Sequence, residues 1–297
     1  LALAAPAFMK PGVTDEAARA LARSSASNVF AFAVAAALFT AAFLAPIIGT
    51  YADLTDERKK ILVRITVAGG VLASSMFFLT DGRWVAALAL YFLTQVLINV
   101  ALGLHSSILP HVARPDDLNR VSSLGYAMGY IGGGVLLAVN TAFFFLAGRI
   151  GISNDLAVRL AFLSVGVWWI GFMIPYVIHV PEPRILSLGR NRSRLPLRDS
   201  FGQIVRTIHA VRTYKDLFKM LIAFWFYMEG VGAIILLATA FGAALGLDMA
   251  VLIGTLLMTQ IVAFPYAILF GRIPDPGNRW RGAFLSMLLW SAVTLPA

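Results

Sequence analysis

Long apolar runs separated by short polar segments make up most of this chain. A helix needs about 20 mostly apolar residues to cross the hydrocarbon core of a bilayer. Such runs occupy 28–51, 61–80, 84–109, 121–147, 157–179, 217–241 and 249–271, and another begins near residue 282. The pattern predicts an all-α polytopic membrane protein.

The chain begins at Leu1 without an initiator methionine and ends at Ala297 inside an apolar run. We interpret residues 1–8 as the tail of a further span, so that the runs above become spans 2 to 8 and the start of span 9. We therefore expect a fragment of a longer protein. Its predicted parts are an N-terminal transmembrane half at 1–180, a connector at 181–215 and the start of a C-terminal half at 216–297.

Composition and charge support the membrane interpretation. Hydrophobic residues make up 59% of the chain and charged residues only 13%, against about 25% charged residues in soluble proteins. The absence of cysteine excludes disulfides and thiolate metal sites. The net charge of +9 would suit a nucleic-acid partner. However, the basic residues stand in short loops between apolar runs, as charges that set membrane orientation do, so we expect no nucleic acid.

The basic residues also predict the orientation. Of the 24 Lys and Arg residues, 18 fall in the loops on one side of the predicted spans and 6 on the other. Because the more basic side faces the cytoplasm, we place the 181–215 connector there, in a bacterial-type inner membrane.

The connector carries an amphipathic pattern of its own. Pro181-Glu182-Pro183 ends the preceding helix, and apolar residues then recur at helical spacing with arginines between them. This pattern fits a helix lying on the cytoplasmic leaflet, with a solvated basic linker as the alternative. The apolar positions are Leu197, Phe201, Ile204, Val205, Ile208 and Val211, and the basic ones are Arg198, Arg206 and Arg212.

One polar pattern occurs twice, each time between two apolar runs. A glycine there lets two helices approach closely, an aspartate caps the next helix or pairs with a base, and a basic cluster holds the turn in the cytoplasm. A repeat in both halves of an apolar chain indicates a secondary transporter built from parallel repeats. The first copy is Gly49, Asp53, Arg58 and Lys59, and the second is Gly271, Asp275 and Arg279.

With these segments placed, the chain resembles the major facilitator superfamily, in its vacuolar-effluxer-like branch related to autophagy-associated amino-acid effluxers of fungal vacuoles. The resemblance lies in three stretches: the loop motif within 45–59, the stretch 109–134 with its Gly-rich end, and 227–275 with Tyr227-Met228-Glu229-Gly230-Val231. It implies two pseudo-symmetric six-helix halves, a small solute with amino acids foremost, and proton coupling. The loop motif departs from the superfamily pattern, because Leu54 and Pro276 follow the two aspartates where a basic residue is usual.

Glu229 is the acidic residue placed well inside an apolar run. An ionisable group within a membrane is costly and is a functional candidate by default. We interpret Glu229 as the group that loads and releases the coupled proton, and the resemblance also implies an acidic residue here. A structural carboxyl that holds a neighbouring helix is the alternative.

Polar side chains also follow one face of the run at 84–109. This stripe suits an aqueous cavity that hydrogen-bonds a zwitterion, or equally a set of hydrogen bonds between helices. His105 lies off the stripe and is a candidate proton relay. The stripe consists of Tyr91, Gln95, Asn99 and Ser106.

The run at 121–147 is rich in glycine. Gly125, Gly129 and Gly133 repeat every four residues, which predicts close packing against another helix. The further cavity candidates are Tyr126, Tyr130, Asn140 and Gln260.

The sequence therefore predicts a proton-coupled secondary transporter that works by alternating access. We expect a monomer without cofactor or metal ion, whose partners are the solute, protons and the lipid bilayer. An integral-membrane enzyme is one alternative, although no metal-spaced cluster of His, Asp and Glu and no Ser/His/Asp set stands near an interface. A non-transporting scaffold or sensor is the other.

Overall fold

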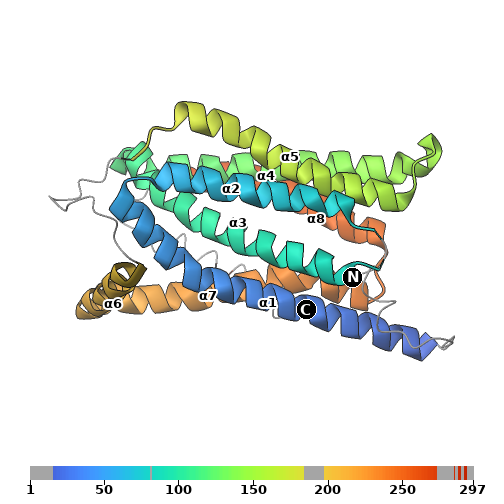
Figure 1. Ribbon diagram of the computed structural model, residues 1–297, viewed down its shortest axis with the longest axis horizontal. Coiled ribbons are helices and arrows are strands. Elements are labelled where there is room, and N and C mark those ends of the chain that lie inside the picture. The colour runs from blue at the N-terminus through green and yellow to red at the C-terminus, as the bar shows by residue number, and fades with distance from the viewer. Residues whose placement is uncertain are drawn as a thin grey trace. The chain divides into compact units, whose positions relative to one another are not determined.

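The computed structural model describes residues 16–80, 82–183 and 197–272, together with 284, 287–288 and 291–292. These residues form helices and turns without any strand, which confirms the predicted all-α class (Figure 1). The α-helices are α1 (Glu16–Thr55), α2 (Arg58–Ser75), α3 (Trp84–Val112), α4 (Leu118–Ala147), α5 (Asn154–His179), α6 (Leu197–Thr213), α7 (Lys215–Ala244) and α8 (Met249–Gly271).

Each of the seven complete apolar runs forms a helix. In the described part of the chain, six helices are long and apolar enough to cross a membrane, and they lie in α1 to α5 and α8. The remaining run, 217–241, forms α7, whose 30 residues also exceed the length that a hydrocarbon core of about 30 Å requires. The connector pattern forms α6, as predicted. The polytopic membrane architecture is therefore confirmed.

Local signals fix where these helices begin. Asp56, between α1 and α2, has a φ of 54°, a left-handed conformation that aspartate tolerates because its short side chain can hydrogen-bond locally. The Ser153 side chain caps α5 by accepting a hydrogen bond from the Leu156 amide at 3.2 Å. Before α8, Asp248 Oδ1 accepts a hydrogen bond from the Met249 amide at 2.9 Å. Such caps satisfy amides that have no partner within the helix.

The helices pack into two compact units, and the first joins residues 1–112 and 143–235. Within it, α2 packs against α3 and α5, and α1 packs against α3 and α6. Small and branched side chains such as Ala37, Leu62 and Val100 form the core between α1, α2 and α3. The backbones of α2 and α5 nearly touch, because a Cβ added to Gly70 would lie 3.1 Å from the Gly166 carbonyl oxygen.

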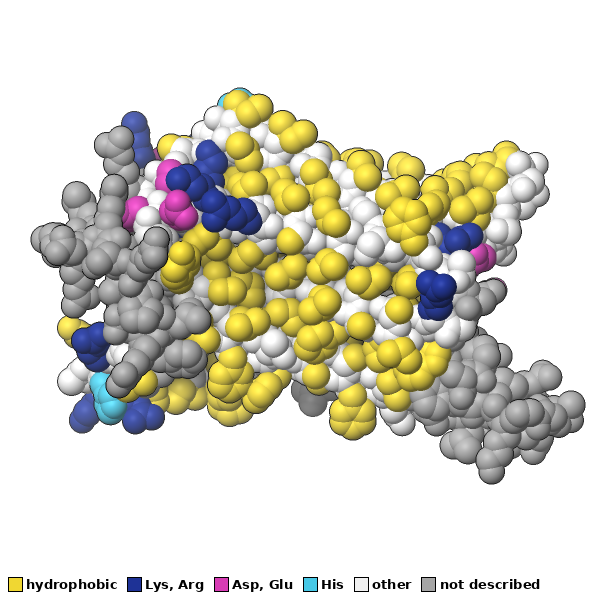
Figure 2. Space-filling model, viewed as in Figure 1, with side chains coloured by type: hydrophobic (Ala, Val, Ile, Leu, Met, Phe, Trp, Pro, Cys, Tyr) yellow, Lys and Arg dark blue, Asp and Glu magenta, His cyan; other side chains and the backbone are white. Residues whose placement is uncertain are grey.

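Most large apolar side chains outside this core are exposed. On the face shown in Figure 2 they cover the middle of the helices, while Lys and Arg side chains lie toward the helix ends. Lipid tails are as apolar as leucine, so such a surface costs nothing in a bilayer.

The second unit joins residues 113–142 and 236–297. In it α8 approaches the first part of α4 at two places. A Cβ added to Gly271 would overlap Ser123, and one added to Gly134 would lie 3.1 Å from Cβ of Gln260. These packing units differ from the two transmembrane halves predicted at 1–180 and 216–297. The division into those halves stays a prediction.

Candidate functional site

The first copy of the repeated motif lies at the turn between α1 and α2. Asp53 is in the last helical turn of α1, and Arg58 is the first residue of α2. Arg58 Nε donates a hydrogen bond to the Asp53 carboxylate at 2.5 Å. Only 13% of the Arg58 side chain is exposed, against 42% for Asp53, so the arginine end of this ion pair is largely shielded from water.

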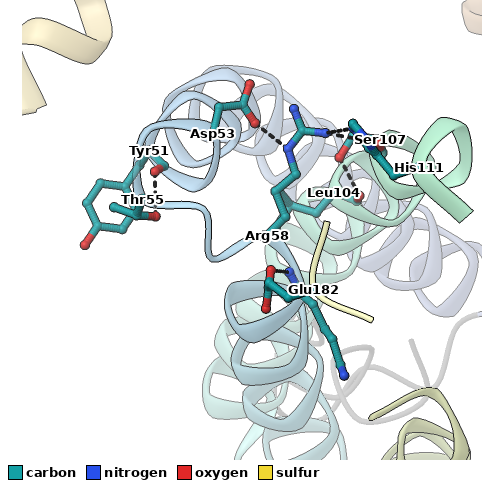
Figure 3. Close-up of polar contacts among 9 residues, drawn as sticks. Tyr51, Asp53, Thr55, Arg58, Leu104, Ser107, His111 and Glu182 are labelled. Carbon is teal, nitrogen blue, oxygen red and sulfur yellow. Dashed lines mark hydrogen bonds and ion pairs between the residues drawn. The ribbon is translucent and has the colours of Figure 1, made fainter. Parts of the chain in front are cut away.

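Arg58 also reaches α3 (Figure 3). Its Nη1 donates to the Ser107 carbonyl oxygen at 3.1 Å and lies 3.1 Å from His111 Nε2. A guanidinium group has only donors, so His111 Nε2 is the acceptor side of this contact. One side chain thus joins the ends of three helices. We call Asp53, Arg58, Ser107 and His111 the charged turn.

A second set of contacts joins α2 to α5. Glu182, three residues after α5, accepts hydrogen bonds from the backbone amides of Lys59 at 2.7 Å and Lys60 at 3.3 Å. In return, Lys59 Nζ donates to the Val177 carbonyl oxygen, near the end of α5, at 2.7 Å. A carboxylate therefore meets the positive end of one helix and an ammonium group the negative end of the other. We call these contacts the reciprocal cap.

The sequence did not single out Glu182 as a functional residue. Its neighbours were interpreted only as helix breakers, although Pro183 is in fact buried. One signal was available: α2 begins with three basic residues, its first turn holds no acidic side chain, and Glu57 supplies no side-chain cap. Such a helix start requires a carboxylate from elsewhere, and an acidic residue held between two prolines is a suitable donor of one.

The other ion pairs of this turn lie at the protein surface. Glu57 lies 3.1 Å from Lys60 Nζ and 4.0 Å from Arg64 Nη1, and the two basic side chains are mostly exposed. Exposed pairs of this kind contribute about 0–1 kcal/mol. The second motif copy is described only at Gly271, because Asp275 and Arg279 lie outside the described residues.

The predicted cavity stripe on α3 lies in the same unit. Asn99 Nδ2 donates to the Gln95 carbonyl oxygen at 2.8 Å, and both residues are half-buried. Ser106 is exposed and donates to Leu102 of its own helix. The Tyr91 ring centroid lies 5.0 Å from that of Phe30 on α1. The structure thus brings Gln95 and Asn99 together. Their role in lining a cavity stays a prediction.

His105 lies apart from this stripe, as expected. Its ring centroid is 5.9 Å from that of Tyr176 on α5. The Tyr176 hydroxyl is buried and has no hydrogen-bond partner among the described residues. The pair is polar but makes no direct hydrogen bond, so a relay role for His105 stays a prediction.

In the second unit, Gln260 lies against the glycine-rich face of α4. A Cβ added to Gly133 would lie 3.7 Å from Gln260 Nε2, and Gln260 Oε1 is buried without a partner among the described residues. Gly125 and Gly129, predicted to pack in the same way, have nothing within 4 Å of such a Cβ in the described part of the chain.

The other predicted cavity residues of this unit lie on α4. Tyr126 is exposed, whereas Tyr130 and Asn140 are half-buried. Glu229 belongs to α7, but its side chain lies outside the described residues. Among the described residues, no three His, Asp or Glu side chains form a group that could hold a metal ion.

Comparison with known proteins identifies the family of this chain. The family described as vacuole effluxer Atg22 like matches residues 20–295. A Bacillus subtilis (strain 168) protein named uncharacterized MFS-type transporter YxiO is 29% identical over 279 residues, which are 91% of this chain and 62% of that protein. Autophagy-related protein 22-2 of Aspergillus clavatus is 28% identical over 122 residues, which are 39% of this chain and 19% of that protein. No solved structure matches.

This chain spans less than two thirds of the length of either relative. Within that span the family match covers nearly every residue, and the membrane helices and the charged turn agree with it. The chain belongs to the vacuole effluxer Atg22-like family of the major facilitator superfamily.

Proposed function

We propose that the protein is a secondary transporter that moves a small solute across a membrane by alternating access. The observation that carries the proposal is the largely buried Arg58 side chain, which joins α1 to α3 through Asp53 and Ser107. Such contacts form in one arrangement of the helix ends and break in another, so they stabilise one end-state of a transport cycle. The family description and the name of the Bacillus relative support this function.

The proposed solute is an amino acid and the proposed coupling ion is a proton. Gln95 and Asn99 supply amide groups to a zwitterion within the membrane, and Glu229 supplies the carboxyl that exchanges a proton. The excess of basic residues on one side supports a cytoplasmic charged turn and connector in an inner membrane.

Transport by purified protein tests the proposal. Protein from the complete reading frame is reconstituted into proteoliposomes and supplied with labelled amino acids, with and without a pH gradient. We expect accumulation that requires the gradient. If no amino acid is taken up but a solute of another class is, the proposed substrate is wrong and the proposed transport activity stands.

Proton coupling is tested at Glu229. Glu229→Gln mimics the protonated carboxyl, so it should abolish gradient-driven accumulation and retain solute exchange, which needs no net proton movement. Asp248→Asn is the matched control, because this acid caps α8 in a loop and should leave accumulation unchanged. Full accumulation by Glu229→Gln would assign coupling to another residue.

A further inference from the structure

α6 is held at the membrane surface by its connection to α7. Only Tyr214 separates the end of α6 at Thr213 from the start of α7 at Lys215. α7 contains the predicted span 217–241, so the C-terminal end of α6 lies where α7 enters the bilayer. Tyr214 is 68% exposed, and tyrosine favours the headgroup level of a membrane.

One side of α6 is basic and has no acidic partner among the described residues. Arg206, His209 and Arg212 recur at every third residue and are exposed, whereas Ile204 and Val211 are half-buried. A three-residue step falls about 60° short of a full helical turn, so the three side chains form an oblique band that begins opposite the apolar face at Arg206 and reaches that face at Arg212, near Val205. The stretch 202–214 contains neither Asp nor Glu, and Figure 2 shows basic and histidine side chains gathered over α6.

The arginines of this band are not neutralised within the described residues. Arg206 Nε donates to the Gly202 carbonyl oxygen at 3.2 Å, and the Arg212 guanidinium carbon lies 5.9 Å from the Phe218 ring centroid. Neither contact supplies a negative charge. Both guanidinium groups therefore keep donors for an anion, and planar guanidinium suits phosphate oxygens better than ammonium does.

We propose that the α6 basic band binds the headgroups of anionic phospholipids in the leaflet where α7 enters the membrane. The band lies at headgroup depth because α7 fixes its end, and its charge complements the phosphate layer. Each surface arginine contributes about 1 kcal/mol toward an anionic leaflet, or about fivefold in binding. The surface is independent of the proposed transport cycle, so either proposal can fail without the other.

A fluorescent probe on α6 tests the proposal in the whole chain. The sequence has no cysteine, so Ala210→Cys, at an exposed position, accepts a single environment-sensitive fluorophore. The labelled protein is placed in nanodiscs of phosphatidylcholine with increasing phosphatidylglycerol. We expect the emission to shift with the phosphatidylglycerol share, and high salt to reverse the shift.

Substitutions then assign the response to the band. Arg206→Gln with Arg212→Gln should move the midpoint of the phosphatidylglycerol titration about 25-fold. Arg206→Lys with Arg212→Lys should retain most of the response. Arg83→Gln with Arg149→Gln removes the same charge from two exposed loop positions away from α6 and should change nothing.

Three results would overturn the proposal. The first is equal emission in phosphatidylcholine alone, which would make α6 a purely apolar anchor. The second is an unchanged midpoint in the Gln pair whose thermal unfolding matches that of the unsubstituted protein. The third is the same emission shift on adding inorganic phosphate to phosphatidylcholine nanodiscs, which would assign the band to a soluble anion.

Discussion

At the scale of residues, Arg58 holds three helix ends with a single side chain. Its side chain is largely buried although Asp53 is partly exposed, and its Nη1 contacts Ser107 and His111 on α3. Hydrogen bonds to charged groups contribute about 1.5–3 kcal/mol. Losing the Asp53 charge would therefore shift the balance between two end-states about tenfold or more, since 1.4 kcal/mol corresponds to a factor of ten.

In the proposed transport cycle Asp53 holds a helix end and does not bind the solute. Asp53→Asn should accordingly slow transport about tenfold while leaving solute affinity nearly unchanged. Initial rates and KM in proteoliposomes measure both quantities. Glu57→Gln is the matched control: it removes a carboxylate from the same turn, but one with mostly exposed partners, and should transport normally. A large loss of affinity at normal turnover would contradict the assigned role.

At the scale of elements, α2 depends on α5 for its first turn. The amides of Lys59 and Lys60 have no carbonyl partner within α2, and Glu182 accepts from both. Glu182→Ala should therefore speed hydrogen exchange of these amides by about five- to thirtyfold, corresponding to roughly 1–2 kcal/mol of charge–dipole stabilisation. Mass spectrometry of the peptide containing them measures the change. Glu57→Ala should leave the exchange rate as it is, and equal rates in both variants would argue against the reciprocal cap.

The α2–α5 contact also depends on glycine. A Cβ on Gly166 would overlap the Gly70 carbonyl oxygen and the Ser74 hydroxyl, so Gly166→Ala should cost about 1–3 kcal/mol through overpacking. Gly171→Ala in the same helix meets open space and should be neutral or stabilising by up to about 1 kcal/mol. Thermal unfolding in detergent compares the two, and an unchanged Tm for Gly166→Ala would show that the helices can separate there at little cost.

At the scale of the whole molecule, the basic residues predict the orientation. Ser187→Cys in the connector should react with a membrane-impermeant thiol reagent only after lysis, because the connector is predicted to be cytoplasmic. Asn154→Cys, exposed at the opposite end of α5, should react in intact cells. Labelling in the reverse order would invert the topology.

The sequence predicted the features that depend on neighbours along the chain. Apolar runs located the spans because a bilayer requires about 20 such residues in succession, and Asp53 could be matched with the basic cluster five residues away. The role of Glu182 could not be predicted, because its partner Lys59 lies 123 residues earlier in the chain. The approach of α8 to α4 at Ser123 and Gly134 could not be predicted for the same reason. A small residue indicates that another helix can pack closely, but the sequence does not show which helix does so.

The reciprocal cap also has a consequence for biogenesis. Glu182 is synthesised 123 residues after Lys59, about 6–25 s later at ordinary translation rates. During that interval Arg58, Lys59 and Lys60 carry their charges without this carboxylate. That is the period in which α3, α4 and α5 would enter the membrane, and in which positive charge would hold the preceding turn on its predicted cytoplasmic side. The neutralising group arrives only once the orientation of these helices has been decided.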